Sequence, residues 1–177
     1  MAAGEVKRLG YADPPYIGCA HLYAGEADYA GEVDHVRLVE RLEGEFDGWV
    51  LHAAATPASF ALLAPVVAKI PGVRWAAWVK SFAAFKANVS LAYAWEPVIV
   101  KPARKPVVRG YLVMRDWIRC PITLERGLTG AKPDAVCHWA FAMMGAERAD
   151  ELVDLFPGTG AVGRAWAAWC RQGALAL

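Results

Sequence analysis

Two short segments of the sequence combine residue types whose spacing suits chemistry on a bound molecule. The first is Asp13-Pro14-Pro15-Tyr16, which follows an apolar, strand-like run. Each proline fixes φ and lacks an N–H, so the carbonyl of Pro14 can be held rigidly toward a substrate, next to the carboxylate of Asp13. By itself the tetrapeptide also fits a polar turn after a strand, because Asp and Pro are common turn formers.

The second segment is Asp154-Leu155-Phe156-Pro157-Gly158-Thr159-Gly160, near the other end of the sequence. It follows an apolar strand and precedes a helical stretch, so its glycines let the backbone approach a ligand, and the helix N-terminus faces the same crevice. Residues 158–163 also match the Gly-x-Gly-x-x-Gly fingerprint of dinucleotide-binding enzymes. That fingerprint needs an acidic residue about 20 positions further on, and no Asp or Glu follows Asp154. A nicotinamide enzyme is therefore the less favoured interpretation.

These two segments need strands to position them, and the sequence alternates short strands with helices. The expected strands are residues 7–12, 48–53, 73–80, 95–101 and 152–156, and residues 173–177 suffice for one very short strand. The expected helices are residues 35–44, 56–70, 132–145 and 161–171. Asp34 and Thr56 are expected to cap two of them. The alternation predicts an α/β fold, with a mostly parallel sheet covered by helices on both faces.

The charge is segregated along the chain, although the formal net charge is only +1. Residues 1–50 contain ten Asp and Glu against four Lys and Arg, whereas residues 101–126 contain seven basic residues against two acidic ones. A local basic patch lets a near-neutral protein bind phosphate, and a solvated loop is the alternative. We therefore expect a single domain over residues 1–177, with a basic excursion at about 101–130 as a nucleic-acid-binding insertion.

The four cysteines lie far apart and form no Cys-x-x-Cys pair, so neither a zinc site nor a disulfide framework is predicted. Reduced thiols and the lack of a signal-peptide pattern favour a cytoplasmic protein. The most apolar window, residues 53–68, is interrupted by two prolines and two hydroxyl residues and does not indicate a membrane span. No metal is expected.

Taken together, the Asp-Pro-Pro-Tyr segment and the acidic-apolar-Phe-x-Gly-x-Gly loop resemble the amino-methyltransferases, which methylate adenine N6 or cytosine N4. The order here is permuted, with the target motif first and the cofactor loop last. This order resembles the DNA enzymes that begin with the catalytic half, and the messenger-RNA adenosine methyltransferases with Asp-Pro-Pro-Trp. The resemblance implies S-adenosylmethionine as cofactor and a Rossmann-like class I methyltransferase fold, circularly permuted and minimal, with the last long strand beside the first.

The resemblance also assigns roles to residues. The Asp13 side chain and the Pro14 carbonyl would accept hydrogen bonds from the target amino group, with Pro15 completing the rigid segment. Tyr16 would stack on the base, which must be flipped out of a duplex or be single-stranded. The residues expected to bind the cofactor are Tyr11, Ala12, Asp13, Lys132, Pro133, Asp154, Phe156, Pro157, Gly158, Thr159 and Gly160. Those expected to contact nucleic acid are Lys86, Arg104, Lys105, Arg109, Arg115 and Arg119.

Three smaller resemblances lie between the two main motifs. Residues 78–80, Trp-Val-Lys, resemble a family strand that ends in Trp-x-Lys, and residues 95–99 resemble a His-Glu-plus-apolar strand in which Trp95 replaces the usual His. Residues 130–133 resemble a Lys-Pro segment beside the methionine end of the cofactor, where the ammonium group of Lys132 would meet a carboxylate. The chain departs from the family pattern after the glycine loop, where it lacks the acidic residue that binds the cofactor ribose.

The expected function is methyl transfer from S-adenosylmethionine to the N6 amino group of adenine in DNA. An RNA adenosine methyltransferase, a cytosine-N4 methyltransferase and a catalytically silent nucleic-acid-binding partner subunit are the alternatives. The oligomeric state, including a homodimer, is left open. His52 is expected to be a satisfied core histidine, because it lies within an apolar strand.

Overall fold

A computed structural model describes residues 5–25, 31–81, 90–105, 113–123 and 131–172. In chain order the elements are β1 (Arg8–Ala12), the short 3-10 helix η1 (Ala20–Tyr23), α1 (His35–Glu45), β2 (Gly48–His52), α2 (Pro57–Val67), β3 (Arg74–Val79), β4 (Trp95–Lys101), β5 (Trp117–Arg119), α3 (Asp134–Met144), β6 (Glu151–Asp154) and α4 (Ala161–Gln172). None of the helices in these ranges combines the length and the hydrophobicity needed to cross a membrane.

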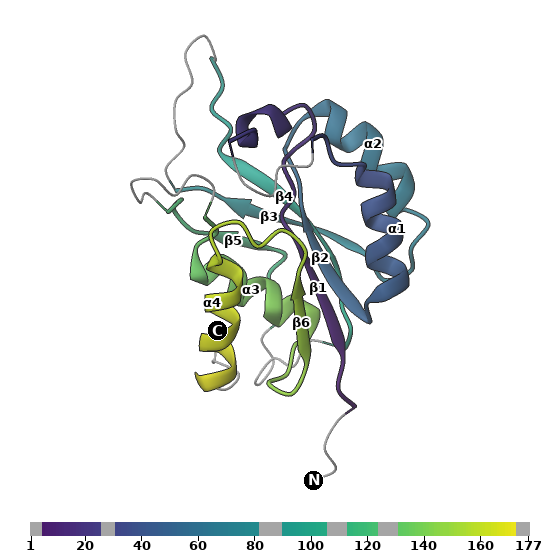
Figure 1. Ribbon diagram of the computed structural model, residues 1–177, viewed down its shortest axis with the longest axis vertical. Helices are drawn as coiled ribbons and strands as arrows, with labels where there is room; N and C mark the ends of the chain where they lie inside the picture. The colour runs from purple at the N-terminus through teal and green to yellow at the C-terminus, as the bar shows by residue number, and fades with distance from the viewer. Residues whose placement is uncertain (1–4, 26–30, 82–89, 106–112, 124–130, 173–177) are drawn as a thin grey trace.

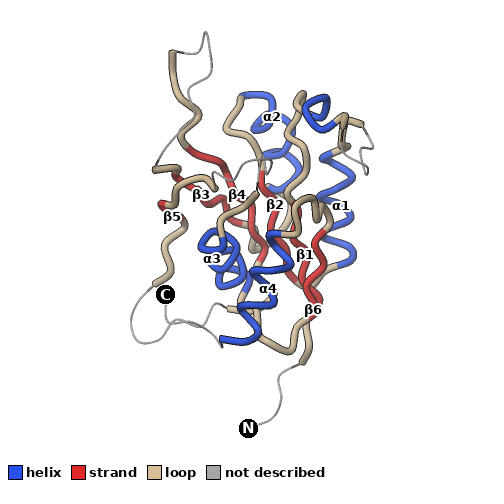
Figure 2. The backbone as a smooth tube through the Cα atoms, turned by 60° about the vertical axis from the view of Figure 1, so that its left-hand side comes forward, coloured by secondary structure: helices blue, strands red, loops and turns tan. Residues whose placement is uncertain are grey.

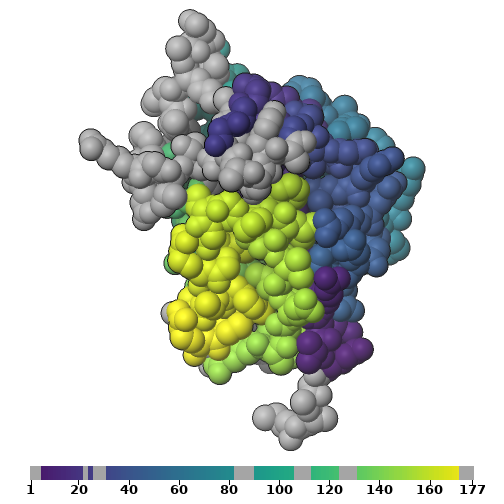
Figure 3. All heavy atoms as spheres, viewed as in Figure 1, coloured from purple at the N-terminus to yellow at the C-terminus, as the bar shows by residue number. Residues whose placement is uncertain are grey.

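The six described strands form one sheet in the order β5-β3-β4-β2-β1-β6. β1 lies parallel to β2 on one side and to β6 on the other, with Tyr11 opposite both Val50 and Asp154. β3 and β5 are also parallel, and among these strands only β4 runs in the opposite direction. The first and last strands are therefore neighbours, as the permuted motif order predicts. Figure 3 shows N-terminal residues in purple against the green C-terminal part.

Helices cover the sheet from both sides, with α1 and α2 on one face and α3 and α4 on the other (Figure 1). Side chains alternate along a strand, so Leu9 and Tyr11 on β1 pack with α3 and α4, whereas Trp49 and Leu51 on β2 pack with α1 and α2. All four side chains are fully buried. Burial on both faces explains why the central strands are apolar along most of their length.

Gly10 on β1 is required by the close approach of α1. A Cβ atom at this position would lie 2.9 Å from Cδ2 of Leu42 and 3.0 Å from the ring of Phe46. The backbone of the strand that carries Asp13 is thereby packed directly against helix side chains, which holds its carboxyl end in place.

Most of the expected elements are confirmed. Asp34 and Thr56 cap α1 and α2 with their side chains, and Gly145 ends α3 in the left-handed conformation, with φ of 69°. The sequence pattern does not predict β5, which lies within the basic stretch and joins the sheet at its edge next to β3. The expected strand at 173–177 lies outside the described residues.

Candidate active site

The two segments that suit chemistry meet at one edge of the sheet. Asp13 directly follows β1 and Asp154 ends β6, and these strands are parallel neighbours, so both residues lie at the edge formed by the carboxyl ends of the strands. The reversed direction of β4 brings its first residues, including Glu96, to the same edge, where Lys80 follows β3. This is the edge at which open α/β sheets bind ligands.

Asp13 is held by Lys132, whose Nζ lies 2.8 Å from Oδ1. Lys132 precedes α3, and its side chain is only 7% exposed. Its ammonium group also lies 3.3 Å from the hydroxyl of Tyr16 and 3.4 Å from Oε2 of Glu96. No described residue donates a hydrogen bond to the other carboxylate oxygen of Asp13, Oδ2. One oxygen of Asp13 is therefore fixed, and the other is available as an acceptor.

Glu96 lies between two lysines and a tyrosine. Its Oε1 is 2.7 Å from Nζ of Lys80, and its Oε2 accepts a hydrogen bond of 2.6 Å from the hydroxyl of Tyr16. Two carboxylates and two ammonium groups thus balance one another in a mostly buried cluster, as buried charges must. The following residues are called the charged network below: Asp13, Tyr16, Lys80, Glu96 and Lys132.

The charged network separates the pKa values of its two carboxyl groups. Burial alone raises the pKa of Glu96, but the ammonium groups of Lys132 and Lys80 outweigh this effect and lower the pKa to about 2. For Asp13 burial is the larger effect and raises the pKa, although Lys132 opposes it. Burial lowers the pKa of Lys132, but the carboxylates of Asp13 and Glu96 outweigh burial and raise it. Glu96 is therefore a fixed negative charge, and Asp13 is the more basic carboxylate.

Next to the charged network, Tyr11 and His52 form a buried pair. The hydroxyl of Tyr11 lies 2.8 Å from Nε2 of His52, and burial lowers the pKa of His52 to about 3. The imidazole is therefore neutral and buried in the core, but it is not fully satisfied as expected, because its Nδ1 has no partner among the described residues. Burial also raises the pKa of the adjacent Cys137 thiol to about 12, which excludes a thiolate nucleophile at neutral pH.

Asp154 begins the glycine loop, which comprises residues 154–160. Its Oδ1 accepts a hydrogen bond of 3.2 Å from the backbone N–H of Phe156, whereas its Oδ2 is buried with no partner within the described ranges. Burial raises the pKa of Asp154. Gly158 and Gly160 have φ values of 39° and 71°, which permit the tight turn into α4. A buried carboxylate oxygen without a donor suits a ligand that brings an N–H group.

The structure limits which of the expected cofactor residues can meet a ligand. Tyr11 and Ala12 are fully buried, so their side chains offer no accessible surface. The carbonyl of Pro133 accepts the first backbone hydrogen bonds of α3, and the ring of Phe156 packs against the core on the side of α1 and α2. Every residue of the glycine loop is at least partly exposed, and Pro157 and Gly158 are the two that count as exposed.

Lys132, which is expected to bind the cofactor, has its ammonium group among three acceptors of the protein. An ammonium group has three N–H donors, and those of Lys132 have three acceptors within the protein, in Asp13, Tyr16 and Glu96. The side chain therefore holds Asp13 in place.

Arg104, which is expected to contact nucleic acid, forms an ion pair within the protein. Its guanidinium group donates to both carboxylate oxygens of Asp150, at 2.6 and 2.8 Å. The side chain of Asp150 has 0% exposure and also accepts from the backbone N–H groups of Lys7 and Glu147. These contacts lie at the amino ends of β1 and β6, the sheet edge opposite to Asp13.

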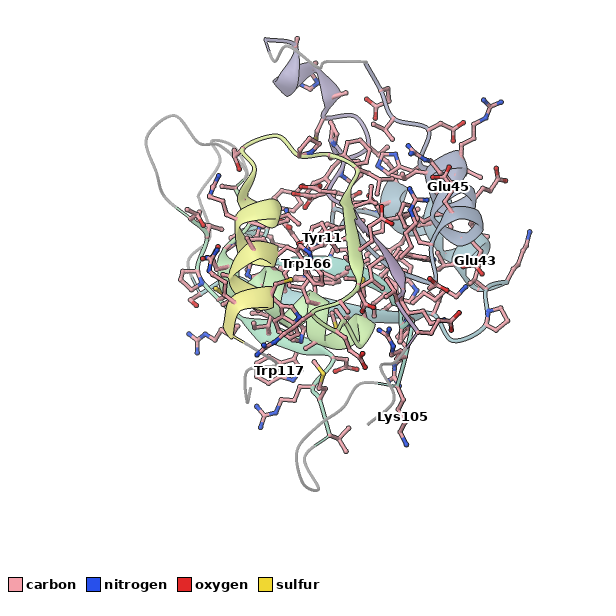
Figure 4. All side chains as sticks on the ribbon, turned by 60° about the horizontal axis from the view of Figure 1, so that its bottom comes forward. Tyr11, Glu43, Glu45, Lys105, Trp117 and Trp166 are labelled. Carbon is pink, nitrogen blue, oxygen red and sulfur yellow. The ribbon has the colours of Figure 1, made fainter. Side chains whose placement is uncertain are left out.

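The other expected basic residues that the structure describes are Lys105, Arg115 and Arg119. Lys105 is exposed next to Arg104, and Figure 4 shows its side chain pointing away from the body of the molecule. Arg115 precedes β5, whereas Arg119 ends β5 and pairs with Val79, so Arg119 lies at the edge that carries Asp13. Lys86 and Arg109 lie outside the described residues.

Two members of the charged network, Lys80 and Glu96, were not among the expected site residues. Their segments resemble family strands, but sequence spacing alone does not bring them together with Asp13. One feature of the sequence does point to Glu96. It is the single carboxylate at the start of the otherwise apolar, buried strand β4, and an unpaired buried Glu is rare. The described residues contain no group of His, Cys, Asp and Glu side chains that could hold a metal.

Comparison of the sequence with models of protein families gives no match, and comparison with curated proteins gives none either. Among solved structures, the crystal structure of the M1.HpyAVI–SAM complex is similar, with a TM-score of 0.58 and 15% sequence identity over 94% of this chain and 79% of that chain. A second crystal structure of M1.HpyAVI has a TM-score of 0.49 and 17% identity over 94% of this chain and 78% of that one. The first likeness confirms the expected fold class, an α/β fold with a mostly parallel sheet.

Proposed function

We propose that this protein transfers a methyl group from S-adenosylmethionine to the N6 amino group of adenine in DNA. The observation that carries the proposal is the position of Asp13 beside Asp154. Because Tyr11 pairs with Asp154 in the sheet, the Asp-Pro-Pro-Tyr segment and the glycine loop leave neighbouring strands at the same edge. An amine bound at Asp13 and a cofactor bound at the glycine loop would therefore be adjacent.

The glycine loop fits S-adenosylmethionine, which supplies a methyl group on a sulfonium. Oδ2 of Asp154 is buried without a donor among the described residues, and the cofactor's ammonium group would remove the cost of that unpaired oxygen. The exposed backbone at Gly158 and the N-terminus of α4 would hold the rest of the molecule. The ribose would be held by the backbone of the glycine loop or by polar groups near Arg171 and Gln172. The similar M1.HpyAVI structure was crystallised with SAM, which supports this choice of cofactor.

The charged network prepares Asp13 to bind an amine. The amino group of adenine is a poor nucleophile because its lone pair is delocalised into the ring, so the enzyme must favour a tetrahedral nitrogen. Lys132 fixes Oδ1 of Asp13, no described residue donates to Oδ2, and the carbonyl of Pro14 would be a second, rigid acceptor. Because burial raises the pKa of Asp13, its carboxylate is also a stronger acceptor for the proton that the amine must lose.

The proposal is tested by expressing the protein in cells, digesting their DNA and identifying the modified nucleosides by mass spectrometry. We expect N6-methyladenine with the wild-type protein and none with Asp13→Ala. N4-methylcytosine would identify the cytosine alternative, and modification confined to RNA would identify the RNA enzyme. Saturable binding of S-adenosylmethionine, measured by calorimetry, separates these outcomes from a catalytically silent partner subunit, which would show neither binding nor product.

A further inference from the structure

One face of the sheet is only partly covered near the β3–β5 edge. On α2, Phe60 contacts Trp75 and Trp95, with ring centroids 5.2 and 6.1 Å apart. Beyond this contact, Ala77 and Val79 on β3 remain partly exposed, although they lie in the interior of the sheet. Figure 2 shows β3 and β5 at the side of the molecule away from α1.

The strand register places exposed tryptophans on both sides of these smaller side chains. Val79 pairs with Trp95 on β4, and Ala77 pairs with Trp117 on β5. Paired residues project from the same face of a sheet, and the spacing of strands and residues puts the Cα atoms of Trp95 and Trp117 about 12 Å apart. The two side chains are 40% and 43% exposed. Exposed tryptophans on a sheet face are unusual for a surface that meets only water.

The charged residues on this face are arginines. The guanidinium group of Arg115 lies over the ring of Trp117, 5.3 Å from its centroid, and Arg119 shares the face because it pairs with Val79. Side chains alternate along a strand, so Asp116 lies on the opposite face of the sheet, where its carboxylate is 3.9 Å from the guanidinium group of Arg74. The surface called the aromatic face below consists of these described residues, none of which is a carboxylate: Phe60, Trp75, Ala77, Val79, Trp95, Arg115, Trp117 and Arg119.

We infer that the aromatic face binds single-stranded nucleic acid, with bases stacked on Trp95 and Trp117 and phosphates beside Arg115 and Arg119. Aromatic rings accept any base by stacking, and arginines follow the backbone, so the combination suits a single strand of DNA or RNA. The inference rests on the proposed function. Trp95 directly precedes Glu96 of the charged network, so a strand on the aromatic face leads to the sheet edge where Asp13 lies.

The test measures binding of labelled single-stranded DNA, single-stranded RNA and duplex DNA of one sequence by fluorescence anisotropy, without S-adenosylmethionine. Trp95→Ala combined with Trp117→Ala is expected to weaken single-strand binding at least about tenfold, since each stacked base contributes about 5- to 150-fold. Duplex binding should change less. Arg119→Ala should reduce the salt slope for single strands by about 0.7. The matched control is Arg37→Ala, which removes an exposed arginine on α1. It should change neither the single-strand affinity nor the salt slope.

Trp117→Phe keeps a ring at this position and should retain most of the affinity, which separates lost stacking from lost folding. Unchanged single-strand affinity in the double alanine variant would overturn the inference. The inference would also be overturned if the double alanine variant binds oligonucleotides normally but sedimentation shows that it no longer associates with another protein molecule. The DNA and RNA arms identify which nucleic acid occupies the face. If the wild type has no methyltransferase activity but the tryptophan variants lose binding, the proposed function fails and the inference stands.

Discussion

The hydroxyl of Tyr16 donates a hydrogen bond of 2.6 Å to Oε2 of Glu96, although the two residues are 80 positions apart in the sequence. The contact depends on the reversed direction of β4, which carries the start of that strand to the carboxyl ends of its neighbours. The ring that we expect to stack on the target base is therefore anchored at its hydroxyl end, and Lys80 and Lys132 fix the anchor in turn.

Asp13→Ala should reduce methyl transfer by about 10²–10³ or more, because the residue accepts a hydrogen bond from the amine in the transition state. The affinity for S-adenosylmethionine, measured by calorimetry, should be nearly unchanged. Asp116→Ala, which removes an exposed carboxylate at the start of β5, is the control. Turnover of Asp13→Ala within about tenfold of wild type would contradict the assignment.

Tyr16→Phe should retain most of the substrate affinity, since the ring remains and the loss is confined to the contacts of the hydroxyl, which include those with Glu96 and Lys132. Tyr16→Ala should weaken substrate binding by about 1–3 kcal/mol if the ring stacks on one base, and Tyr16→Trp should be tolerated better than Ala. The Michaelis constants of the three variants provide the check. Equal losses in all three would mean that stacking is not the function of this side chain.

Glu96→Gln should lower the free energy of unfolding by about 3 kcal/mol at neutral pH, because it removes one partner of a buried ion pair. The pKa of Glu96 falls from 4.5 to about 2 on folding, so its ionised form stabilises the fold above pH 4.5, and this contribution disappears as the pH falls through about 2. Urea unfolding at a series of pH values should show the two proteins converging in acid. A difference that stays constant with pH would argue against an ionised Glu96.

Arg104→Ala should lower the free energy of unfolding by about 3 kcal/mol, because it leaves the buried carboxylate of Asp150 without its charged partner. The salt dependence of nucleic-acid binding should stay the same, since Arg104 faces the edge opposite to the site. The neighbouring Lys105→Ala, at an exposed position, should change stability little. If Arg104→Ala instead reduces the slope of log K for nucleic-acid binding against log salt, Arg104 contacts phosphate.

Gly10→Ala should destabilise the protein by about 1–3 kcal/mol, because its Cβ would overlap Leu42 and Phe46. Gly44→Ala is the matched control. Gly44 lies within α1, and a Cβ there would meet nothing within 4 Å, so alanine should stabilise the helix by about 0.5–1 kcal/mol. Thermal unfolding of both variants gives the comparison, and a neutral Gly10→Ala would show that α1 can move away from β1.

The strands and helices were predictable from the sequence because local signals mark them. Asp34 and Thr56 are capping residues, Gly145 ends a helix, and the apolar runs of β1, β2 and β4 are typical of strands buried on both faces. β5 gives no such signal, since it has only three residues, two of them exposed. Its position depends on tertiary pairing with β3, which local sequence does not encode.

The site was predictable in part. Asp13 and Asp154 belong to recognisable segments that each follow a strand, and parallel neighbours bring them to one edge. Glu96 joins them only because β4 is reversed, and the role of Lys132 depends on which acceptors surround its ammonium group in three dimensions. Arg104 is expected to contact nucleic acid because it lies in a basic run, and local sequence does not reveal its ion pair with Asp150, 46 positions away.

The pairing of β1 with β6, in which Arg8 lies opposite Glu151, makes folding depend on contacts that are remote along the chain. Such pairs stabilise the protein only after a long loop has closed, so they slow folding relative to chains rich in local contacts. During synthesis, β1 is complete long before β6 leaves the ribosome, and its outer edge has unpaired N–H and C=O groups throughout that interval. The strand that carries Asp13 thus has an edge open to aggregation until β6 is made.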